Sequence, residues 1–387
     1  RRRLRFAGNG AWYLIAAVLV AMALGAVAFQ QALALVERNP ARVGAWLGER
    51  TGRPVAFDAL HTEWTRRGPL LRLEGLRVGE GDGVSIGEAE ILIAQYEGLL
   101  PGRSFTELRL RGLHLSLLRD DDGRWQVRGL PGQDGGEDPF AVLEGLGELQ
   151  VVAGRLDIHA PALGLEASVP RIDLRMRVDG PRVRAATRAR VQDDAAPVDV
   201  VLDIDRNRGE GRLHAALRDA DLGAWREFAH FGGIAIESGR GRAQAWATLR
   251  DHRIASATAD AELTNLVLRG APLGEEHDPP RQRVDGLSLL ARVEMDGDDW
   301  RLLAPRLRIG PRASEQVLDG LHASGGAQVA LRARRIDAGP LVSALALGDR
   351  LPAPLRRWLL AAAPTAVLHD IDVAGVPTTP PEVDASR

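Results

Sequence analysis

The residue types best suited to metal chemistry are spaced in a way that favours turns over metal binding. Nine histidines are scattered along the 387 residues, and no two are four residues apart as on the helix of a zinc protease. Asp120-Asp121-Asp122-Gly123 and Asp296-Gly297-Asp298-Asp299 superficially resemble calcium loops. An EF-hand, however, needs ligands at alternate positions and a glutamate at the twelfth. We therefore interpret both as hairpin turns and predict no metal site.

The sequence also contains no clear motif for a catalytic nucleophile or for cofactor binding. The absence of cysteine excludes thiolate nucleophiles, disulfides and cysteine-ligated metals. No G-x-S-x-G elbow occurs, although a catalytic triad scattered through the fold stays open. Gly239-Arg240-Gly241 has two of the three glycines of a dinucleotide fingerprint without its strand-to-helix context, and we interpret it as a kink at a strand edge. We expect a protein that is not an enzyme, with no catalytic residues and no cofactor.

Charge gives no reason to expect nucleic acid as a partner. The net charge is −2, and no basic tract interleaved with aromatic residues occurs beyond the N-terminal tip. We therefore exclude nucleic-acid binding.

Residues 11–36 are predicted to form a transmembrane helix. Four arginines lie within the tip 1–10, and no charged residue occurs from Phe6 to Val36. About 20 apolar residues are needed to cross roughly 30 Å of hydrocarbon. Because arginine-rich flanks stay in the cytoplasm, we expect a single-pass membrane protein with the rest of the chain on the far side of the membrane, which in a bacterium is the periplasm. The alternative is a cleaved secretory signal, with Ala26-Val27-Ala28 or Ala32-Leu33-Ala34 as the cleavage site; either reading exports the chain.

Residues 37–52 predict a short amphipathic helix next to the membrane, which is either an interfacial helix or a core helix that closes one end of a domain. After it, the spacing of apolar residues changes to a period of two. Asn39 would cap this helix and Pro40 would occupy its first turn, while Gly52 and Pro54 end it. Residues 53–130 alternate apolar and polar side chains between short turns, which favours an antiparallel β-meander. The alternating sets are Val55 and Phe57, Leu71 and Leu73, Leu76 and Val78, Ile91 and Ile93, Leu108 and Leu110, and Leu113, Leu115 and Leu117.

A short pattern recurs in which the alternation slips by one residue at a Gly, Asn or Asp. A strand that slips in this way keeps its apolar side chains on one face only if the backbone bulges there, and these residues tolerate the left-handed conformation. We therefore expect the sheet to bend at these points. The copies are residues 73–78, 110–115, 263–268, 284–289 and 368–373.

The remaining residues continue the sheet with a few interruptions. Residues 131–147 are predicted as a loop with a short helix, and residues 148–387 as further strands with short helices near 221–231 and 340–363. The expected fold is mostly β: an N-terminal transmembrane helix followed by an extended, curved antiparallel meander with few helices. We expect the chain to be truncated at its C-terminus.

The chain resembles the AsmA-like proteins of Gram-negative bacteria, and within them the YhdP branch. The resemblance rests on the N-terminal anchor, on residues 49–55, on Trp64 followed by residues 69–78, on residues 118–125, and on residues 239–243 before Trp246. It implies an inner-membrane protein whose periplasmic body is a taco-like β-groove. It also implies a role in moving phospholipid between the inner and outer membranes and in maintaining the outer-membrane barrier.

On this reading one apolar face of the meander would hold phospholipid acyl chains. The residues predicted to line it are Leu73, Leu76, Val78, Ile91, Ile93, Leu108, Leu110, Leu113, Leu115 and Leu117. Alternation alone also fits a closed β-sandwich, which would make the chain a tethered assembly or interaction module with outer-membrane or envelope proteins as partners. An envelope hydrolase is a third reading.

Overall fold

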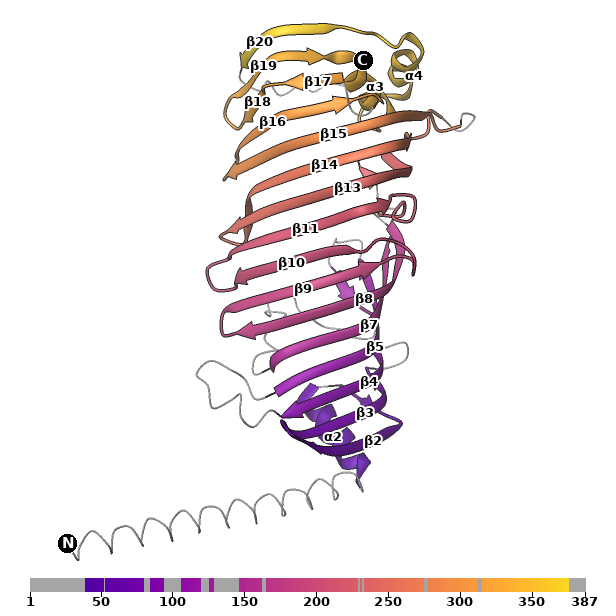
Figure 1. Ribbon diagram of the computed structural model, residues 1–387, viewed down its shortest axis with the longest axis vertical. Coiled ribbons are helices and arrows are strands. Elements are labelled where there is room, and N and C mark those ends of the chain that lie inside the picture. The colour runs from indigo at the N-terminus through magenta and orange to yellow at the C-terminus, as the bar shows by residue number, and fades with distance from the viewer. Residues whose placement is uncertain are drawn as a thin grey trace, which may run out of the picture. The chain divides into compact units, whose positions relative to one another are not determined.

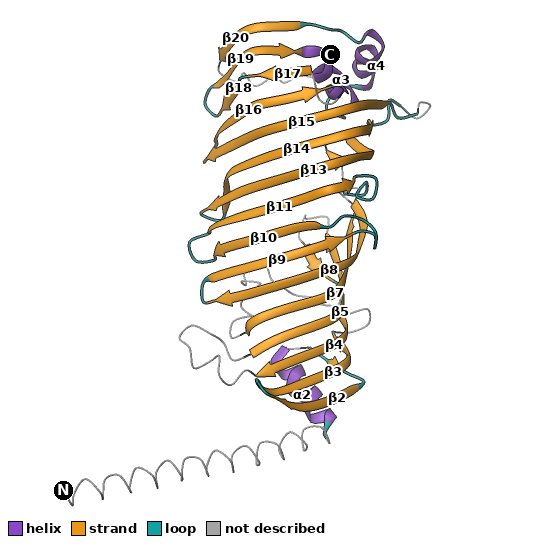
Figure 2. Cartoon of the chain, in the orientation of Figure 1, coloured by secondary structure: helices purple, strands orange, loops and turns teal. Residues whose placement is uncertain are grey.

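Strands make up most of the computed structural model, and the few helices are short (Figures 1 and 2). The structure describes residues 39–51, 53–79, 84–93, 106–119, 125–128, 146–161, 165–228, 230–231, 233–274, 278–311 and 315–375. The helices are α2 (Pro40–Thr51), α3 (Ala338–Leu347) and α4 (Ala353–Ala362). The strands are β1 (Val55–Ala56), β2 (Ala59–Thr65), β3 (Gly68–Val78), β4 (Val84–Ile93), β5 (Thr106–Arg119), β6 (Trp125–Val127), β7 (Leu146–Ala160), β8 (Leu165–Asp179), β9 (Arg182–Arg190), β10 (Val198–Asp205), β11 (Glu210–Asp221), β12 (His230–Phe231), β13 (Ile234–Arg250), β14 (Arg253–Arg269), β15 (Arg281–Asp296), β16 (Asp299–Ile309), β17 (Glu315–Asp319), β18 (Leu321–Gly325), β19 (Val329–Asp337) and β20 (Val367–Gly375).

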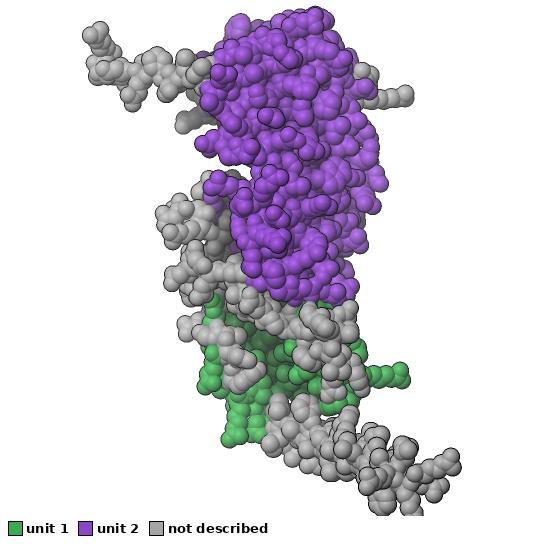
Figure 3. Space-filling view, turned by 90° about the vertical axis from the view of Figure 1, so that its left-hand side faces the viewer, with its two compact units in different colours: residues 1–116, 126–154 green, residues 117–125, 155–387 purple. Residues whose placement is uncertain are grey.

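The chain divides into two compact units, coloured separately in Figure 3. Unit 1 comprises residues 1–116 and 126–154, and unit 2 comprises residues 117–125 and 155–387. The mostly-β, antiparallel meander predicted from the alternation is therefore confirmed, with the strands distributed over both units.

Unit 1 is a small sheet with α2 packed on its apolar face. Strands β1 and β2 both pair with β3, and β3, β4, β5 and β7 pair in succession. Val43 and Leu47 of α2 pack against the buried core residues of this sheet. The buried core residues are Leu60, Leu73, Leu76, Val84, Ile86 and Ala89.

Unit 2 is a meander in which nearly every strand pairs with the strand before and after it. Strands β8, β9, β10 and β11 pair in order, β11 pairs with β13, and β13 to β16 continue the series. β16 pairs with both β17 and β18, which pair in turn with β19, and β19 pairs with β20. A second cluster of buried residues, with Val317 at 1% exposure, lies among β16 to β19.

The left-handed backbone expected at the slip is found at four of the five copies of the recurring pattern, although the register does not shift across them in the pairs β3–β4, β4–β5, β14–β15 and β19–β20. Gly75, Gly112, Asn265 and Asp370 all have φ between 51° and 62°, the left-handed region. The fifth copy differs because the residue set aside from the ladder is Asp285, between the pairs Thr264–Gly286 and Leu266–Val284.

Along β3, β4 and β5, the residues that face each other at such positions on neighbouring strands are both left out of the pairing, so the register of the two strands is the same on either side of them. Glu74 pairs with Glu88 and Leu76 with Ile86, so Gly75 and Gly87 are skipped together. The same step continues into β5, where Gly112 is skipped opposite Gly87. Gly75 has a φ of 62°, and a Cβ there would lie 1.9 Å from Oδ2 of Asp58, so a larger residue would both strain the backbone and displace the Asp58 side chain.

One of the two helical regions predicted within residues 148–387 needs correction. In place of a helix near 221–231, residues 222–228 form turns with bonds between residues three apart, such as Trp225 N to Leu222 O at 3.0 Å. A helix of only these seven residues would leave most of its backbone N–H and C=O groups without partners inside the helix. The short helices predicted near 340–363 are confirmed as α3 and α4.

No helix among the described residues is both long and apolar enough to cross a membrane. The predicted segment 11–36 and the tip 1–10 lie outside the described residues, as does most of the loop 131–147.

Candidate functional site: one apolar face of the sheet in unit 2

The strand register of unit 2 collects apolar side chains into continuous rows across the sheet. Val200 of β10 is opposite Ala215 of β11, which is followed by Ala245 of β13, Ala259 of β14 and Ala291 of β15. Side chains two residues apart share a face, so the row two residues further along each strand lies on the same side. We call these positions the apolar face of unit 2: Leu174, Met176, Ala185, Val200, Leu202, Leu213, Ala215, Ala245, Ala247, Ala257, Ala259, Ala291 and Val293.

The apolar face is only partly covered. Most of its side chains are half-buried, whereas Met176 is buried and Ala245 is exposed. The helices of the described chain pack elsewhere: α2 against β1, and α3 against α4, β17 and β20. In a closed sandwich the inner faces of two sheets would bury these positions. The described residues thus present an apolar surface that their own helices do not fill.

The opposite face of the same strands is held by charge pairs. Arg188 donates from Nε to Oδ1 of Asp199 at 2.7 Å, and Arg182 donates from Nε and Nη2 to Asp203 at 2.8 and 2.6 Å. These hydrogen bonds stabilise the ionised carboxylates, so the pKa of Asp199 and that of Asp203 are lowered from the ordinary aspartate value. One face of these strands is therefore apolar, whereas the other carries ion pairs that favour contact with water.

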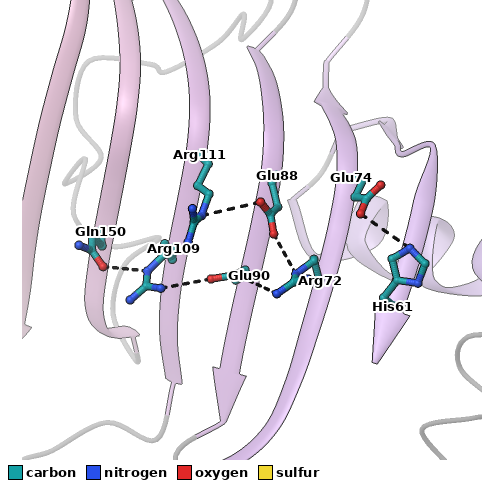
Figure 4. A network of polar contacts seen from close by, with 8 residues as sticks. All are labelled: His61, Arg72, Glu74, Glu88, Glu90, Arg109, Arg111 and Gln150. Atoms are coloured by element: carbon teal, nitrogen blue, oxygen red, sulfur yellow. Dashed lines mark hydrogen bonds and ion pairs between the residues drawn. The ribbon is translucent and has the colours of Figure 1, made fainter. Parts of the chain in front are cut away.

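The polar face of unit 1 carries a ladder of alternating charges (Figure 4). Its centre is Glu90, which is 9% exposed and lies between two arginines from the strands on either side. The contacts are Arg72 Nη2 to Glu90 Oε1 at 3.1 Å, Arg109 Nη1 to Glu90 Oε2 at 3.4 Å, Arg72 Nε to Glu88 Oε1 at 2.8 Å, Arg111 Nε to Glu88 Oε2 at 3.7 Å, Arg109 Nε to Gln150 Oε1 at 2.9 Å, and His61 Nε2 to Glu74 Oε1 at 3.7 Å. A charged outer face leaves the opposite, apolar face as the candidate binding surface here too.

The residues predicted to line a groove do share one face, which is partly a packed core. Leu73 pairs through Ala89 with Leu110, and Ile91 pairs with Leu108. Leu73 and Leu76 are buried at 1% and 8% exposure beneath α2, so they are structural here. Val78, Leu110, Leu113 and Leu115 pack against that core from its margin, Ile91, Leu108 and Leu117 are half-buried, and Ile93 is 44% exposed. A lining role for the outer members of this set stays a prediction.

Sequence reasoning missed the corresponding surface in unit 2. Its central strands present alanine, at 243, 245 and 247 of β13 and at 257, 259 and 261 of β14. Alanine gives a weaker alternation signal than leucine, although its strict period of two in both segments would have indicated a common face.

The other sequence candidates have structural roles. Asp296 pairs with Asp299 across the tight turn between β15 and β16, as expected of a hairpin. Gly239 and Gly241 have φ of 155° and 151°, and a Cβ on Gly241 would lie 2.1 Å from Glu262 O. They lie inside β13, where the register with β14 shifts at Gly239, and not at a strand edge as expected. Residues 120–123 lie outside the described residues. Within the described part of the chain, no group of His, Cys, Asp or Glu side chains could hold a metal ion.

Comparison with known proteins gives one match. The model of the family described as YhdP protein matches residues 3–385. No curated protein and no solved structure matches the chain.

Proposed function

Because the chain belongs to the YhdP family, we propose that it is a lipid-binding protein of the cell envelope that takes part in phospholipid transport between the inner and outer membranes. In this proposal residues 11–36 hold it in the inner membrane, with the bulk of the chain in the periplasm. The acyl chains of phospholipids lie on its apolar face, and transport supports the outer-membrane barrier. No catalytic step is involved.

The single observation that carries the proposal is the half-buried apolar face of unit 2, backed by a charged opposite face. Each methylene kept out of water on such a surface contributes about 0.8 kcal/mol, so eight methylenes in contact would contribute roughly 6 kcal/mol. Headgroups would remain in water. Binding of this kind does not by itself set a direction, because the same contacts are available to lipid arriving from either end.

A matched pair of neighbouring valines allows a direct test. Val200 lies on the apolar face, and Val201 lies on the opposite face with 48% exposure. A photoreactive phenylalanine analogue is placed at each position in turn in the full chain, which is expressed in a Gram-negative host and irradiated. We expect phospholipid adducts by mass spectrometry from position 200 and none from position 201. Equal labelling, or none at position 200, would overturn the proposal.

One observation favours the second candidate, a tethered assembly module. The charged face carries an apolar spot in which Trp246 is 41% exposed and its ring centroid lies 5.3 Å from that of His214, beside Val201. Exposed tryptophan is common at the centre of protein interfaces. Protein adducts from position 201 without lipid adducts from position 200 would support this candidate over lipid binding.

A further inference from the structure

Helix α4 exposes two large apolar side chains while it buries a charged one. Leu355 and Trp358, three residues apart and therefore on one side of the helix, are 41% and 59% exposed. Arg356, which points inward, is 3% exposed. On α3, which packs against α4, Leu345 is 47% exposed. Leu359 and Leu360 of α4 are half-buried, so this helix carries large apolar side chains on its exposed side in addition to those on its inward side.

The buried Arg356 fixes the helix pair in this orientation. Its guanidinium donates to the backbone oxygens of Ala346 at 2.9 Å and Leu347 at 3.1 Å, at the C-terminal end of α3. It also donates to Pro272 O at 3.0 Å and Ala271 O at 2.6 Å in the connection between β14 and β15. A cation at a helix C-terminus is favourable because the last carbonyls carry partial negative charge. The hydrogen bonds of Arg356 therefore fix the orientation of α4 in which Leu355 and Trp358 are exposed.

The surface around the exposed side chains is basic. Asp349 is the only acidic residue from Ala338 to Ala366, and it is exposed, as are the two arginines Arg350 and Arg357. Asp349 is also turned toward the neighbouring turn, since a Cβ on Gly233 would lie 2.7 Å from its Cγ. Tryptophan and leucine beside arginine, with no exposed carboxylate on the helix, match the boundary between acyl chains and anionic headgroups.

We propose that the α3–α4 helix pair docks on a lipid bilayer surface that carries anionic headgroups. Leu355 and Trp358 enter the interfacial layer, and Arg357 lies among the phosphates. A second copy of the chain is a poorer occupant, because an isologous contact would place the arginines of both copies together. With two helices of ten residues each, the contact is small, so it acts as an attachment in addition to the membrane anchor proposed above for residues 11–36, and in this respect it rests on the proposed function. The inference does not depend on lipid binding by the sheet.

The absence of cysteine gives a clean local probe. Trp358→Cys in the full chain, labelled with an environment-sensitive fluorophore, is mixed with vesicles of phosphatidylcholine alone or with 30% phosphatidylglycerol, roughly the anionic fraction that makes a surface attractive to basic segments. We expect a blue shift and a several-fold rise in emission with the anionic vesicles, and a smaller effect in high salt. Val201→Cys, labelled in the same way, should show neither.

Substitution of neighbouring exposed residues tests the contact without disturbing the fold. Leu355→Asp with Arg357→Glu should weaken the vesicle response at Trp358→Cys by at least about tenfold in lipid concentration, a change of 1.4 kcal/mol. No response to either vesicle, or an equal response unaffected by salt and by the two substitutions, would overturn the proposal. A blue-shifted emission without vesicles that depends on protein concentration would overturn it in favour of self-association. Lipid adducts at position 200 should be unchanged in these variants, which separates failure here from failure of the lipid-binding function.

Discussion

A single carboxylate on the apolar face should separate an open binding surface from a filled core. Ala259 lies on this face between Ala245 and Ala291, and the adjacent Thr258 lies on the opposite face, beside Arg292. Both side chains are half-buried. The perturbation is therefore Ala259→Asp, with Thr258→Asp as the matched control.

The two possibilities predict different magnitudes. If the face is open, the new carboxylate stays hydrated, so the free energy of unfolding changes by no more than about 1 kcal/mol. An acyl chain crossing it loses contact along three or four methylenes, about 3 kcal/mol at 0.8 kcal/mol each, or roughly a hundredfold in affinity. If the face is a packed core, an unpaired carboxylate there destabilises the fold by several kcal/mol.

The assay combines two measurements on the purified full chain. Phospholipid that co-purifies is quantified by mass spectrometry, and stability is measured by denaturant unfolding followed by circular dichroism. We expect Ala259→Asp to lose most of its lipid at nearly unchanged stability, while Thr258→Asp keeps both. Strong destabilisation by Ala259→Asp alone would refute the reasoning, and so would equal lipid loss in the two variants.

Three further predictions follow from the described contacts. Leu73→Ala, in the core beneath α2, should lower the free energy of unfolding by about 2–5 kcal/mol, whereas Ile93→Ala, at 44% exposure, should cost less than about 1 kcal/mol in the same titration. Asn265→Val should cost at least about 1–2 kcal/mol because its φ is 52°, and Asn265→Gly should cost little; an equal loss in both would show that the side chain and not the backbone matters. Because the pKa of Asp203 is lowered in the folded state, its pairing with Arg182 adds stability that is present above the ordinary aspartate pKa and lost as the pH falls through the lowered value. Asp203→Asn should remove that part of the acid dependence of unfolding, and an unchanged profile would contradict it.

The sequence predicted the sheet well because its signals are local. Alternation of leucine with charged residues in 68–78 and 106–117 places each side chain on a face, and glycine or asparagine at the slip marks the residue with left-handed backbone. Residues 222–228 form turns but were predicted as a helix, because Leu222, Trp225 and Phe228 have helical spacing. The chain there only connects paired strands.

The distinction between core and surface could not be predicted from the same pattern. Leu73 and Leu110 have identical alternation, yet one lies at the centre of the packed cluster and the other at its margin, because only the first is deep beneath α2. That difference depends on how a helix 30 residues earlier docks, which is a long-range contact. The hydrophobic outer side of α4 was hidden for a related reason, since Arg356 looks like a surface residue until its four carbonyl partners are seen.

The step in which Gly75, Gly87 and Gly112 leave the ladder together has a consequence for how such a sheet can vary in length. Side chains alternate between the two faces of the sheet at every residue. Deleting one residue from a single strand would therefore move all side chains beyond the deletion to the other face and bring arginines onto the apolar face. Adding or removing whole hairpins, each with its own offset, would leave every remaining side chain facing as before. The architecture is thus free to grow in paired strands while being intolerant of the smallest insertions.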